Sequence, residues 1–181
     1  DPDRILVGEI RDPETAQIAV QSALTGHLVF TTVHANNVMD VLGRFLNMGL
    51  EPYHFLSSLN CIMTQRLVRV LCRACRRPVQ YAAAALDELG LDQDADATLT
   101  FYEPAGCDEC QGSGFRGRSA VAELVEVTDT IRGLIMERRP ATEIYAAAQA
   151  GGTILLRDAA LAKARTGITS VAEINRVTFA E

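Results

Sequence analysis

Two residues near the start of the chain could carry out acid–base chemistry together. Glu9 and His34 each follow a short apolar run. A carboxylate beside an imidazole can act on a phosphate ester and on the water that attacks it. Such a pair works only if the fold brings its two members close together, so the elements around them decide whether this chemistry is possible.

The residues around this pair predict a strand–helix–strand unit. The apolar, β-branched runs 4–8 and 27–33 are typical of strands that are buried on both faces of a parallel sheet. Between them, Asp12 marks the start of a helix and Gly26 its end. A crossover of this kind makes the two strands parallel. The carboxylate and the imidazole then both lie past the carboxyl ends of the strands, where open α/β sheets bind ligands.

Four of the five cysteines form a second group with chemical potential. Cys72 and Cys75 make one CxxC pair, and Cys107 and Cys110 make another. Two such pairs supply the four thiolates of a tetrahedral structural zinc site, which has no position left for water. Disulfides and a thioredoxin-like redox pair are the alternatives, although a redox CxxC usually occurs singly at the start of a helix. The fifth, Cys61, is expected to be a buried thiol on a helix face.

Composition bounds the remaining possibilities. The chain has 181 residues, 48% of them hydrophobic, and a net charge of −6, which argues against nucleic-acid binding. It lacks an apolar run of about eighteen residues, and Lys163 is its single lysine, outside any GxxxxGK[ST] motif. Because the sequence opens on Asp1-Pro2-Asp3 and runs straight into a strand, we expect it to be part of a longer protein.

The rest of the chain predicts mainly helices around an inserted module. Amphipathic periodicity predicts helices over 37–48 and 52–70, a strand over 119–127, and further helices over 128–136, 142–150, 155–165 and 170–176. The cysteine-rich segment 72–118 is expected to be a small module. Its acidic stretch 92–96 is read as a solvated loop rather than a calcium loop, because Ala97 stands where glycine is needed. Arg44, Arg66 and Arg69 fall outside the apolar stripes and favour a solvated face over a subunit contact.

Several motifs together resemble one protein family, the ATPases that drive type II secretion and type IV pilus assembly. Residues 5–12 resemble the Walker B region of that family, and residues 25–36 resemble its histidine box. The resemblance continues almost to the end of the chain through Gly43-Arg44, the segment 65–69, both CxxC pairs, the segment 112–118 and the segment 167–170. The tetracysteine segment is similar to that of the assembly or secretion branch, since the retraction motors of the superfamily lack it.

The resemblance implies a fold and a set of site residues. The fold would be α/β, the second half of a RecA-like ATPase core (1–71), with an inserted tetracysteine zinc module (72–118) and then the remainder of the core with C-terminal helices (119–181). Glu9 would orient or deprotonate the attacking water, and His34 would sense the γ-phosphate. Arg11 and His27 would be nucleotide-binding residues, although His27 precedes its strand and is less well placed.

The resemblance also implies properties of a parent protein. ATP and Mg²⁺ would be its cofactors and a hexameric ring its assembly. Its partners would be the platform and cytoplasmic-domain proteins of a secretion or pilus machine, at the cytoplasmic side of the inner membrane. Phosphoryl transfer depends on positioning and charge stabilisation. A chain without the phosphate-binding loop is therefore expected to be inactive alone.

Two other functions fit part of the sequence. One is a zinc-stapled interaction module without enzymatic activity, similar to the cysteine-rich domain of DnaJ-type chaperones. The other is a metallohydrolase that uses Glu9, His27 and His34. Seven residues along one strand would separate its two histidines, which makes shared coordination of a metal unfavourable.

Overall fold

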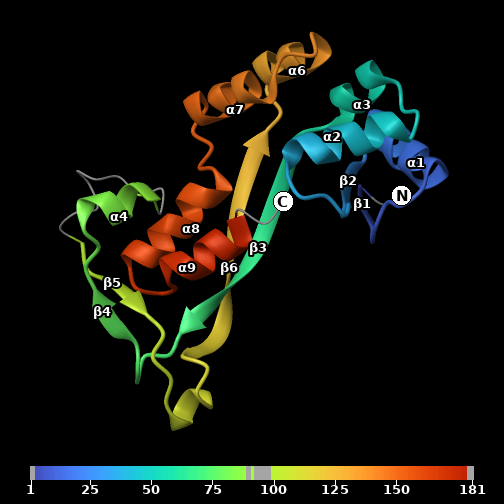
Figure 1. Ribbon diagram of the computed structural model, residues 1–181. Helices are drawn as coiled ribbons and strands as arrows, with labels where there is room; N and C mark the ends of the chain where they lie inside the picture. The colour runs from blue at the N-terminus through green and yellow to red at the C-terminus, as the bar shows by residue number, and fades with distance from the viewer. Residues whose placement is uncertain (1–2, 89–90, 92–98, 179–181) are drawn as a thin grey trace. The chain divides into compact units, whose positions relative to one another are not determined.

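The computed structural model describes residues 3–88, 91 and 99–178, so the acidic stretch 92–96 lies outside the described residues. The chain divides into two compact units (Figure 1): unit 1 comprises residues 1–64 and 124–153, and unit 2 comprises residues 65–123 and 154–181. Two long strands, β3 (Cys61–Leu71) and β6 (Phe115–Glu126), pair with each other, and each contributes residues to both units.

Each unit has its own short elements. In unit 1 they are β1 (Arg4–Val7), α1 (Pro13–Leu24), β2 (Leu28–Thr31), α2 (Val38–Asn47), α3 (Pro52–Ser58), α6 (Asp129–Met136) and α7 (Ala141–Ala150). In unit 2 they are β4 (Arg77–Val79), α4 (Ala83–Glu88), β5 (Phe101–Glu103), the 3-10 turn η1 (Asp108–Cys110), α8 (Leu156–Arg165) and α9 (Val171–Thr178). None of the helices in the described part of the chain is both long enough and apolar enough to cross a membrane.

The strand–helix–strand unit forms as the sequence predicts. Asp12 accepts from the amide of Thr15 at 2.8 Å and starts α1, and Gly26 takes a φ of +100° after its end. The strands β1 and β2 are parallel, with Val7 opposite Thr31. One further bond, from the Ile10 amide to the Thr32 carbonyl at 3.0 Å, continues the ladder past the end of β1. The carboxyl ends of the two strands therefore coincide.

The expectation that this sheet is buried on both faces is wrong for this chain. Val7 and Val29 pack against the core of unit 1, but Leu6 and Phe30, which face each other across the two strands, are 76% and 54% exposed. Successive side chains of a strand point to opposite faces, and the described residues cover one face only. An apolar run indicates that a strand can be buried on both faces. In this structure the described residues bury one face and leave the other exposed.

The helix predicted over 52–70 is also wrong beyond its first two turns. Helix α3 ends at Ser58, Leu59 is extended with ψ 119°, and β3 begins at Cys61. The guanidinium of Arg132 on α6 donates to the carbonyls of Leu56 and Leu59, each at 3.0 Å, which satisfies the end of α3. From there burial alternates every second residue, as in a strand.

The strand assignment changes the surroundings of several residues. Cys61 is exposed on β3 and is not the buried helix thiol that the sequence suggested. Arg66 and Arg69 lie on the same strand rather than on a helix face. Strand β6 begins at Phe115, four positions before the predicted start at Ser119, whereas α6 to α9 begin and end within two residues of their predicted limits.

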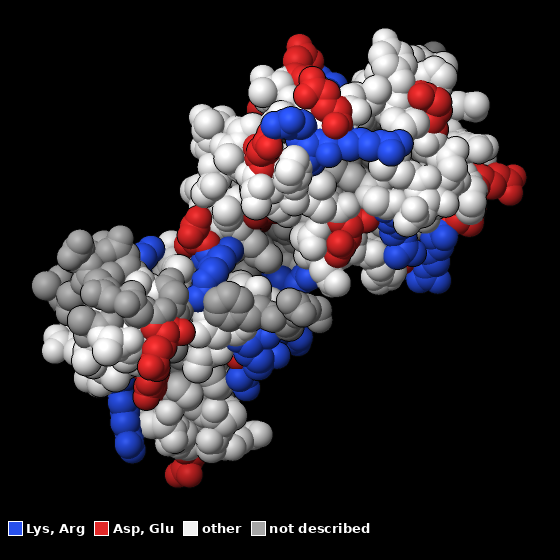
Figure 2. All heavy atoms as spheres, turned by 45° about the horizontal axis from the view of Figure 1, so that its top comes forward, with Lys and Arg blue, Asp and Glu red and all other residues white. Residues whose placement is uncertain are grey.

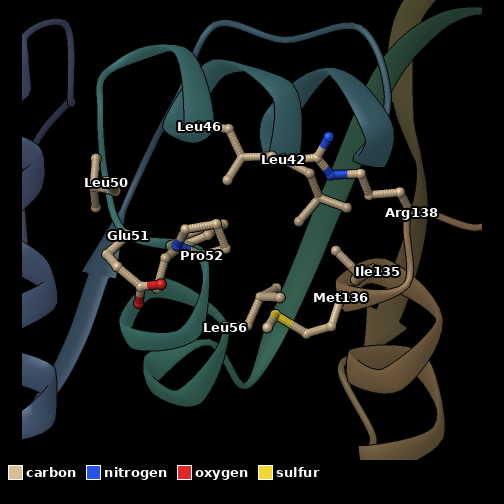
Figure 3. A pocket seen from close by; sticks show the side chains of 10 residues that line it. Leu42, Leu46, Leu50, Glu51, Pro52, Leu56, Ile135, Met136 and Arg138 are labelled. Atoms are coloured by element: carbon tan, nitrogen blue, oxygen red, sulfur yellow. The ribbon is translucent and has the colours of Figure 1, made fainter.

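Unit 1 packs its helices around one apolar core. Phe45 of α2 and Phe55 of α3 stack with their ring centroids 4.6 Å apart. Between α2, α3 and the end of α6 lies an apolar cavity of about 540 Å³, with Glu51 and Arg138 among its lining residues (Figure 3). Glu9 and His34 are not part of that lining. The cavity is therefore separate from the acid–base pair.

Unit 2 is built on a second apolar core and on the buried carboxylate of Glu173. Glu173 of α9 has a fully buried side chain. It accepts from the Nη2 of Arg69 at 2.6 Å, the backbone amide of Arg69 at 3.1 Å, and the Nη2 of Arg176 at 2.7 Å. Burial alone would raise the pKa of Glu173, but these donors lower it to about 2. The carboxylate thus ties α9 to β3.

We expect Glu173→Gln to destabilise the fold in a pH-dependent way. The folded-state pKa lies below the ordinary glutamate value, so the carboxylate stabilises the protein fully above about pH 5 and loses that contribution as pH falls toward 2. The variant should lose about 2–3 kcal/mol at pH 7 in urea unfolding. The difference from wild type should shrink progressively as the pH is lowered.

Glu143→Gln is the matched control for this prediction. Glu143 pairs with Arg139 on the surface of α7, and both side chains are exposed. Removing such a pair should cost less than about 0.5 kcal/mol at any pH. Equal losses in the two variants, or a Glu173→Gln loss that does not change with pH, would show that the buried carboxylate does not stabilise unit 2 as described.

Candidate functional site

The structure brings Glu9 and His34 together at the edge of the β1–β2 sheet. Glu9 follows β1 by two residues and His34 follows β2 by three. His34 Nε2 lies 2.6 Å from Glu9 Oε1, and the guanidinium of Arg11 lies 2.5 Å from Oε2. The expected juxtaposition of carboxylate and imidazole is therefore present, and it arises from the parallel pairing of the two strands.

The two oxygens of Glu9 differ in their surroundings. Oε2 forms an ion pair with Arg11. Oε1 is enclosed and has no aligned hydrogen-bond donor among the described residues, although the His34 ring nitrogen is near. A buried carboxylate oxygen without a donor is uncommon in native structures and is free to accept a hydrogen bond. A water molecule or a substrate hydroxyl could supply one.

The charges around Glu9 keep it ionised. The guanidinium of Arg11 lowers its pKa most strongly, burial acts in the opposite direction, and His34 and Arg44 add smaller lowering contributions. The pKa of Arg11 is raised in turn by Glu9. The carboxylate is therefore a negative hydrogen-bond acceptor at neutral pH. Its low basicity suits it to orient a water molecule.

Two supporting residues hold the polypeptide around this pair. The Nη1 of Arg44 donates to the carbonyl of His34 at 2.9 Å, and the hydroxyl of Thr32 donates to the carbonyl of Gly8 at 2.7 Å. The sequence favoured a solvated role for Arg44, because helical periodicity places it outside the apolar stripe of α2. The contact depends on the path of the loop between β2 and α2. Helical periodicity contains no information about that path.

His27 is not brought to the acid–base pair within this chain. It precedes β2, at the end of the sheet opposite to Glu9, because Leu28 pairs with Arg4 at the start of the register. Its Nδ1 lies 3.0 Å from the carbonyl of Ser22, in the turn after α1. Its predicted nucleotide-binding role thus has no support from the geometry of this chain.

The four predicted cysteines do come together in unit 2. Their sulfur atoms all lie within 4.8 Å of one another, with Sγ–Sγ distances of 3.9 Å for Cys72–Cys107 and 3.8 Å for Cys75–Cys110. Four ligands at about 2.3 Å from a tetrahedral zinc would be about 3.8 Å apart. Disulfide bonds, at about 2.05 Å, are not formed. The cluster fits one tetrahedral metal ion.

Backbone amides support the sulfurs. The amides of Cys107 and Gly114 both donate to Cys110 Sγ at 3.2 Å. Burial raises the pKa of the Cys110 thiol, but these donors and the neighbouring thiols lower it to about 6. A Cβ on Gly114 would lie 2.4 Å from the Cβ of Pro104, so the chain needs glycine at that point of the cluster.

Comparison with known sequences identifies the family. The family described as "Type II/IV secretion system protein" matches residues 1–176. The chain belongs to this family. The resemblance that the Walker B and histidine-box motifs indicated is therefore confirmed.

Curated relatives of this chain belong to pilus assembly and type II secretion systems, and several are named as ATPases. The type IV pilus assembly ATPase PilB of Acinetobacter baylyi is 44% identical over 98% of this chain, which covers 31% of that protein. The type II secretion system protein E of Pseudomonas aeruginosa is also 44% identical, over 100% of this chain and 36% of its own length. The chain thus spans about a third of the length of these relatives.

Solved structures show the same fold at lower sequence identity. The ATPase DotB of Legionella pneumophila aligns over 100% of this chain and 40% of its own, with a TM-score of 0.63 and 20% identity. The pilus retraction motor PilT, solved with bound ADP, aligns over 98% of this chain and 40% of its own, with a TM-score of 0.64 and 22% identity. The predicted α/β, RecA-like fold of this secretion-family chain is confirmed.

Proposed function

We propose that this chain is the part, from the Walker B region onward, of a ring-forming ATPase that couples ATP hydrolysis to protein secretion or pilus assembly. The observation that carries the proposal is the pairing of Glu9 with His34, at 2.6 Å, at the carboxyl ends of two parallel strands in a chain that matches the secretion family over residues 1–176. Relatives from both kinds of machine match at 44% identity, so the proposal covers both.

The geometry supports separate tasks for the two side chains. Glu9 is ionised and has one oxygen without an aligned donor, which suits it to accept a hydrogen bond from the attacking water and hold it in line. His34 lies against that oxygen and is 78% exposed, so it can contact a ligand as well. Bound ATP with Mg²⁺ would supply the phosphoryl group. Arg11 would keep the carboxylate charged, and we retain His27 only as a residue that a ligand or a neighbouring subunit could reach.

The four cysteines suit a structural zinc in the same protein. Cys72, Cys75, Cys107 and Cys110 would occupy all four positions of a tetrahedral ion and leave none for water. The ion would take no part in hydrolysis and would hold the segment 72–118 together. We propose the division into 1–71, 72–118 and 119–181 on this basis. The contacts between residues give a different grouping, in which the segment 72–118 packs with α8 and α9 in unit 2.

The family relation also supports a cellular setting. We propose that the full-length protein assembles as a hexamer at the cytoplasmic side of the inner membrane, through platform and cytoplasmic-domain proteins of its machine. Acidic and basic side chains are interspersed on the visible face (Figure 2), with no single large basic surface there. The net charge of −6 favours protein partners over nucleic acid.

Phosphate release tests the proposal directly. The full-length protein should hydrolyse ATP, whereas the 181-residue chain should bind ATP weakly and release no phosphate above background. The printed sequence contains no GxxxxGK[ST] loop to hold the phosphates. A full-length protein without ATP-dependent phosphate release would refute the proposed function. Turnover by the chain alone at the rate of the full-length protein would refute the proposal that this chain holds only part of the active site.

A zinc-dependent interaction module without enzymatic activity is the second candidate, and the cysteine cluster is the observation that favours it. A DnaJ-like module leaves the β1–α1–β2 unit unexplained, whereas the ATPase accounts for both features. A metallohydrolase would need a third ligand beside Glu9 and His34. In the part of the chain that the structure describes, His27 does not reach them, and the four cysteines form the one cluster close enough to hold a metal.

A further inference from the structure

Unit 2 contains a second concave surface, and its charge is one-sided. A pocket of about 530 Å³ lies between the end of β3, the Cys72–Cys75 turn, the start of β6 and the turn between α8 and α9. We call it the arginine pocket, and its polar lining consists of Arg73, Arg76, Arg118, Ser119 and Thr166. No carboxylate is among the described residues that line it. None of the residues around Glu9 belongs to it.

The three arginines differ from several others in the chain. Arg69 and Arg176 share Glu173, and Arg139 pairs with Glu143. Arg73, Arg76 and Arg118, by contrast, form no ion pair with a carboxylate in the described part of the chain. Three like charges that line one pocket repel one another, and the chain as a whole is negative, at −6. Such a cluster is stable at little cost when an anion completes it.

One of these guanidinium groups is built into the fold. The Nη1 of Arg76 donates to the carbonyl of Gly167 at 2.5 Å, and its guanidinium carbon lies 4.2 Å from the ring centre of Tyr102. Gly167 has a φ of +70°, and a Cβ there would lie 2.7 Å from the Tyr102 ring and 2.9 Å from Nη1. The glycine therefore leaves the space that Arg76 occupies. The remaining N–H groups of the Arg76 guanidinium stay available for a ligand.

The other two arginines stand at defined positions of the backbone. Arg73 belongs to the turn between Cys72 and Cys75, whose sulfurs lie in the four-cysteine cluster. Arg118 lies on β6, next to Ser119, whose hydroxyl accepts from Lys163 Nζ at 3.0 Å. A fourth cation thus stands beside the pocket. The pocket therefore presents one guanidinium that the fold holds, that of Arg76, and two exposed guanidinium groups, those of Arg73 and Arg118.

We infer that the arginine pocket binds a phosphate group carried on a larger molecule. Guanidinium forks match tetrahedral oxyanions with two hydrogen bonds each, and three cations can balance the double charge of a phosphate monoester. The pocket volume is in the range of ligand sites and exceeds what a free ion needs. An anionic lipid headgroup and a soluble phosphate compound share this chemistry. The inference does not depend on ATP hydrolysis.

Binding measurements on the metal-retaining, full-length protein test this inference. One arm titrates inorganic pyrophosphate by calorimetry. The other measures co-sedimentation with vesicles that contain about 30% phosphatidylglycerol in phosphatidylcholine, against pure phosphatidylcholine. We expect saturable binding in at least one arm, and binding about tenfold weaker in the double variant Arg73→Ala/Arg118→Ala. Binding in the first arm identifies a soluble phosphate compound, and binding in the second identifies a lipid headgroup.

The double variant Arg77→Ala/Arg116→Ala is the matched control. It removes the same charge from exposed arginines of unit 2 that do not line the pocket. Its binding should stay within about twofold of wild type. The conservative variant Arg73→Lys/Arg118→Lys keeps the charge but loses the guanidinium forks. Its binding affinity should lie between those of the alanine pocket variant and the control variant. All variants should show the wild-type unfolding transition, because the replaced side chains are exposed.

Three results would overturn the inference. Equal losses in the pocket and control variants would show that net charge alone attracts the probe. Pyrophosphate or vesicle binding that is unchanged in Arg73→Ala/Arg118→Ala would belong to another site, such as that for the nucleotide. Saturable, pocket-dependent binding of an acidic peptide, with no binding of either phosphate probe, would show that the pocket takes carboxylates of a protein partner instead.

Discussion

Glu9→Gln is expected to lower ATP hydrolysis by the full-length protein about 10²-fold or more while leaving nucleotide binding intact. Glutamine keeps the shape of the side chain but removes the negative charge that would accept and orient the attacking water. A 10²-fold loss corresponds to about 2.7 kcal/mol of transition-state stabilisation, which is ordinary for a single well-positioned acceptor. Steady-state phosphate release gives the rate, and titration with a fluorescent nucleotide gives the affinity.

Glu14→Gln is the control for this substitution. Glu14 is an exposed carboxylate in the first turn of α1, close in sequence to Glu9. The structure shows no contact between it and His34. It should retain hydrolysis within about twofold, since exposed charges contribute little. Normal hydrolysis in Glu9→Gln would remove Glu9 from the mechanism, and equal losses in both variants would point to a general charge effect.

Cys110→Ser is expected to have the largest effect on stability. Wild-type protein should contain about one zinc per chain, and the variant should contain almost none, because three remaining thiolates bind a structural ion far more weakly. Metal binding to such a site is also folding free energy, about 10–16 kcal/mol in small zinc-dependent peptides. Unit 2 has its own apolar core, so we expect a smaller loss of several kcal/mol. Elemental analysis and thermal unfolding measure both quantities.

Cys61 offers a matched control for the cysteine substitution. It is exposed on β3 and lies outside the cluster, so Cys61→Ser should keep the metal and the unfolding transition. A strong chelator should reproduce the effect of Cys110→Ser on wild-type protein. If Cys110→Ser kept its metal, or if removal of the metal left the unfolding transition unchanged, the cluster would not be a structural metal site.

Much of the acid–base site could be predicted because its determinants are local. Asp12 caps α1 with a bond to Thr15, three residues away, and Gly26 takes the left-handed conformation directly after the helix. A short crossover then makes the two strands parallel. Once the strands are parallel, Glu9 and His34 lie at one edge. The cap and the glycine act within about one helical turn, and the strand pairing joins residues only 24 positions apart, such as Arg4 and Leu28.

The errors lie where local patterns allow two structures. The residues after Ser58 fit both a helical stripe and an alternating strand, and the pairing of β3 with β6 decides for the strand. Arg132, far along the chain, satisfies the carbonyls at which α3 ends. The role of Arg44 beside His34 was missed for the same reason. Such contacts join residues that are far apart in the sequence, and no local pattern indicates that they meet.

The sequence by itself determined the β1–α1–β2 unit, the two cysteine pairs, the helices α6 to α9 and the family. Caps, glycines, periodicity and motif spacing act over a few residues, and the sequence contains them in full. Only the tertiary structure decided that β3 is a strand, that Leu6 and Phe30 are exposed, that Glu173 joins Arg69, and that three arginines line one pocket. Those outcomes depend on which element lies opposite each side chain. The free energies of burial and of ion pairing come from contacts with that neighbouring element, which is distant in sequence.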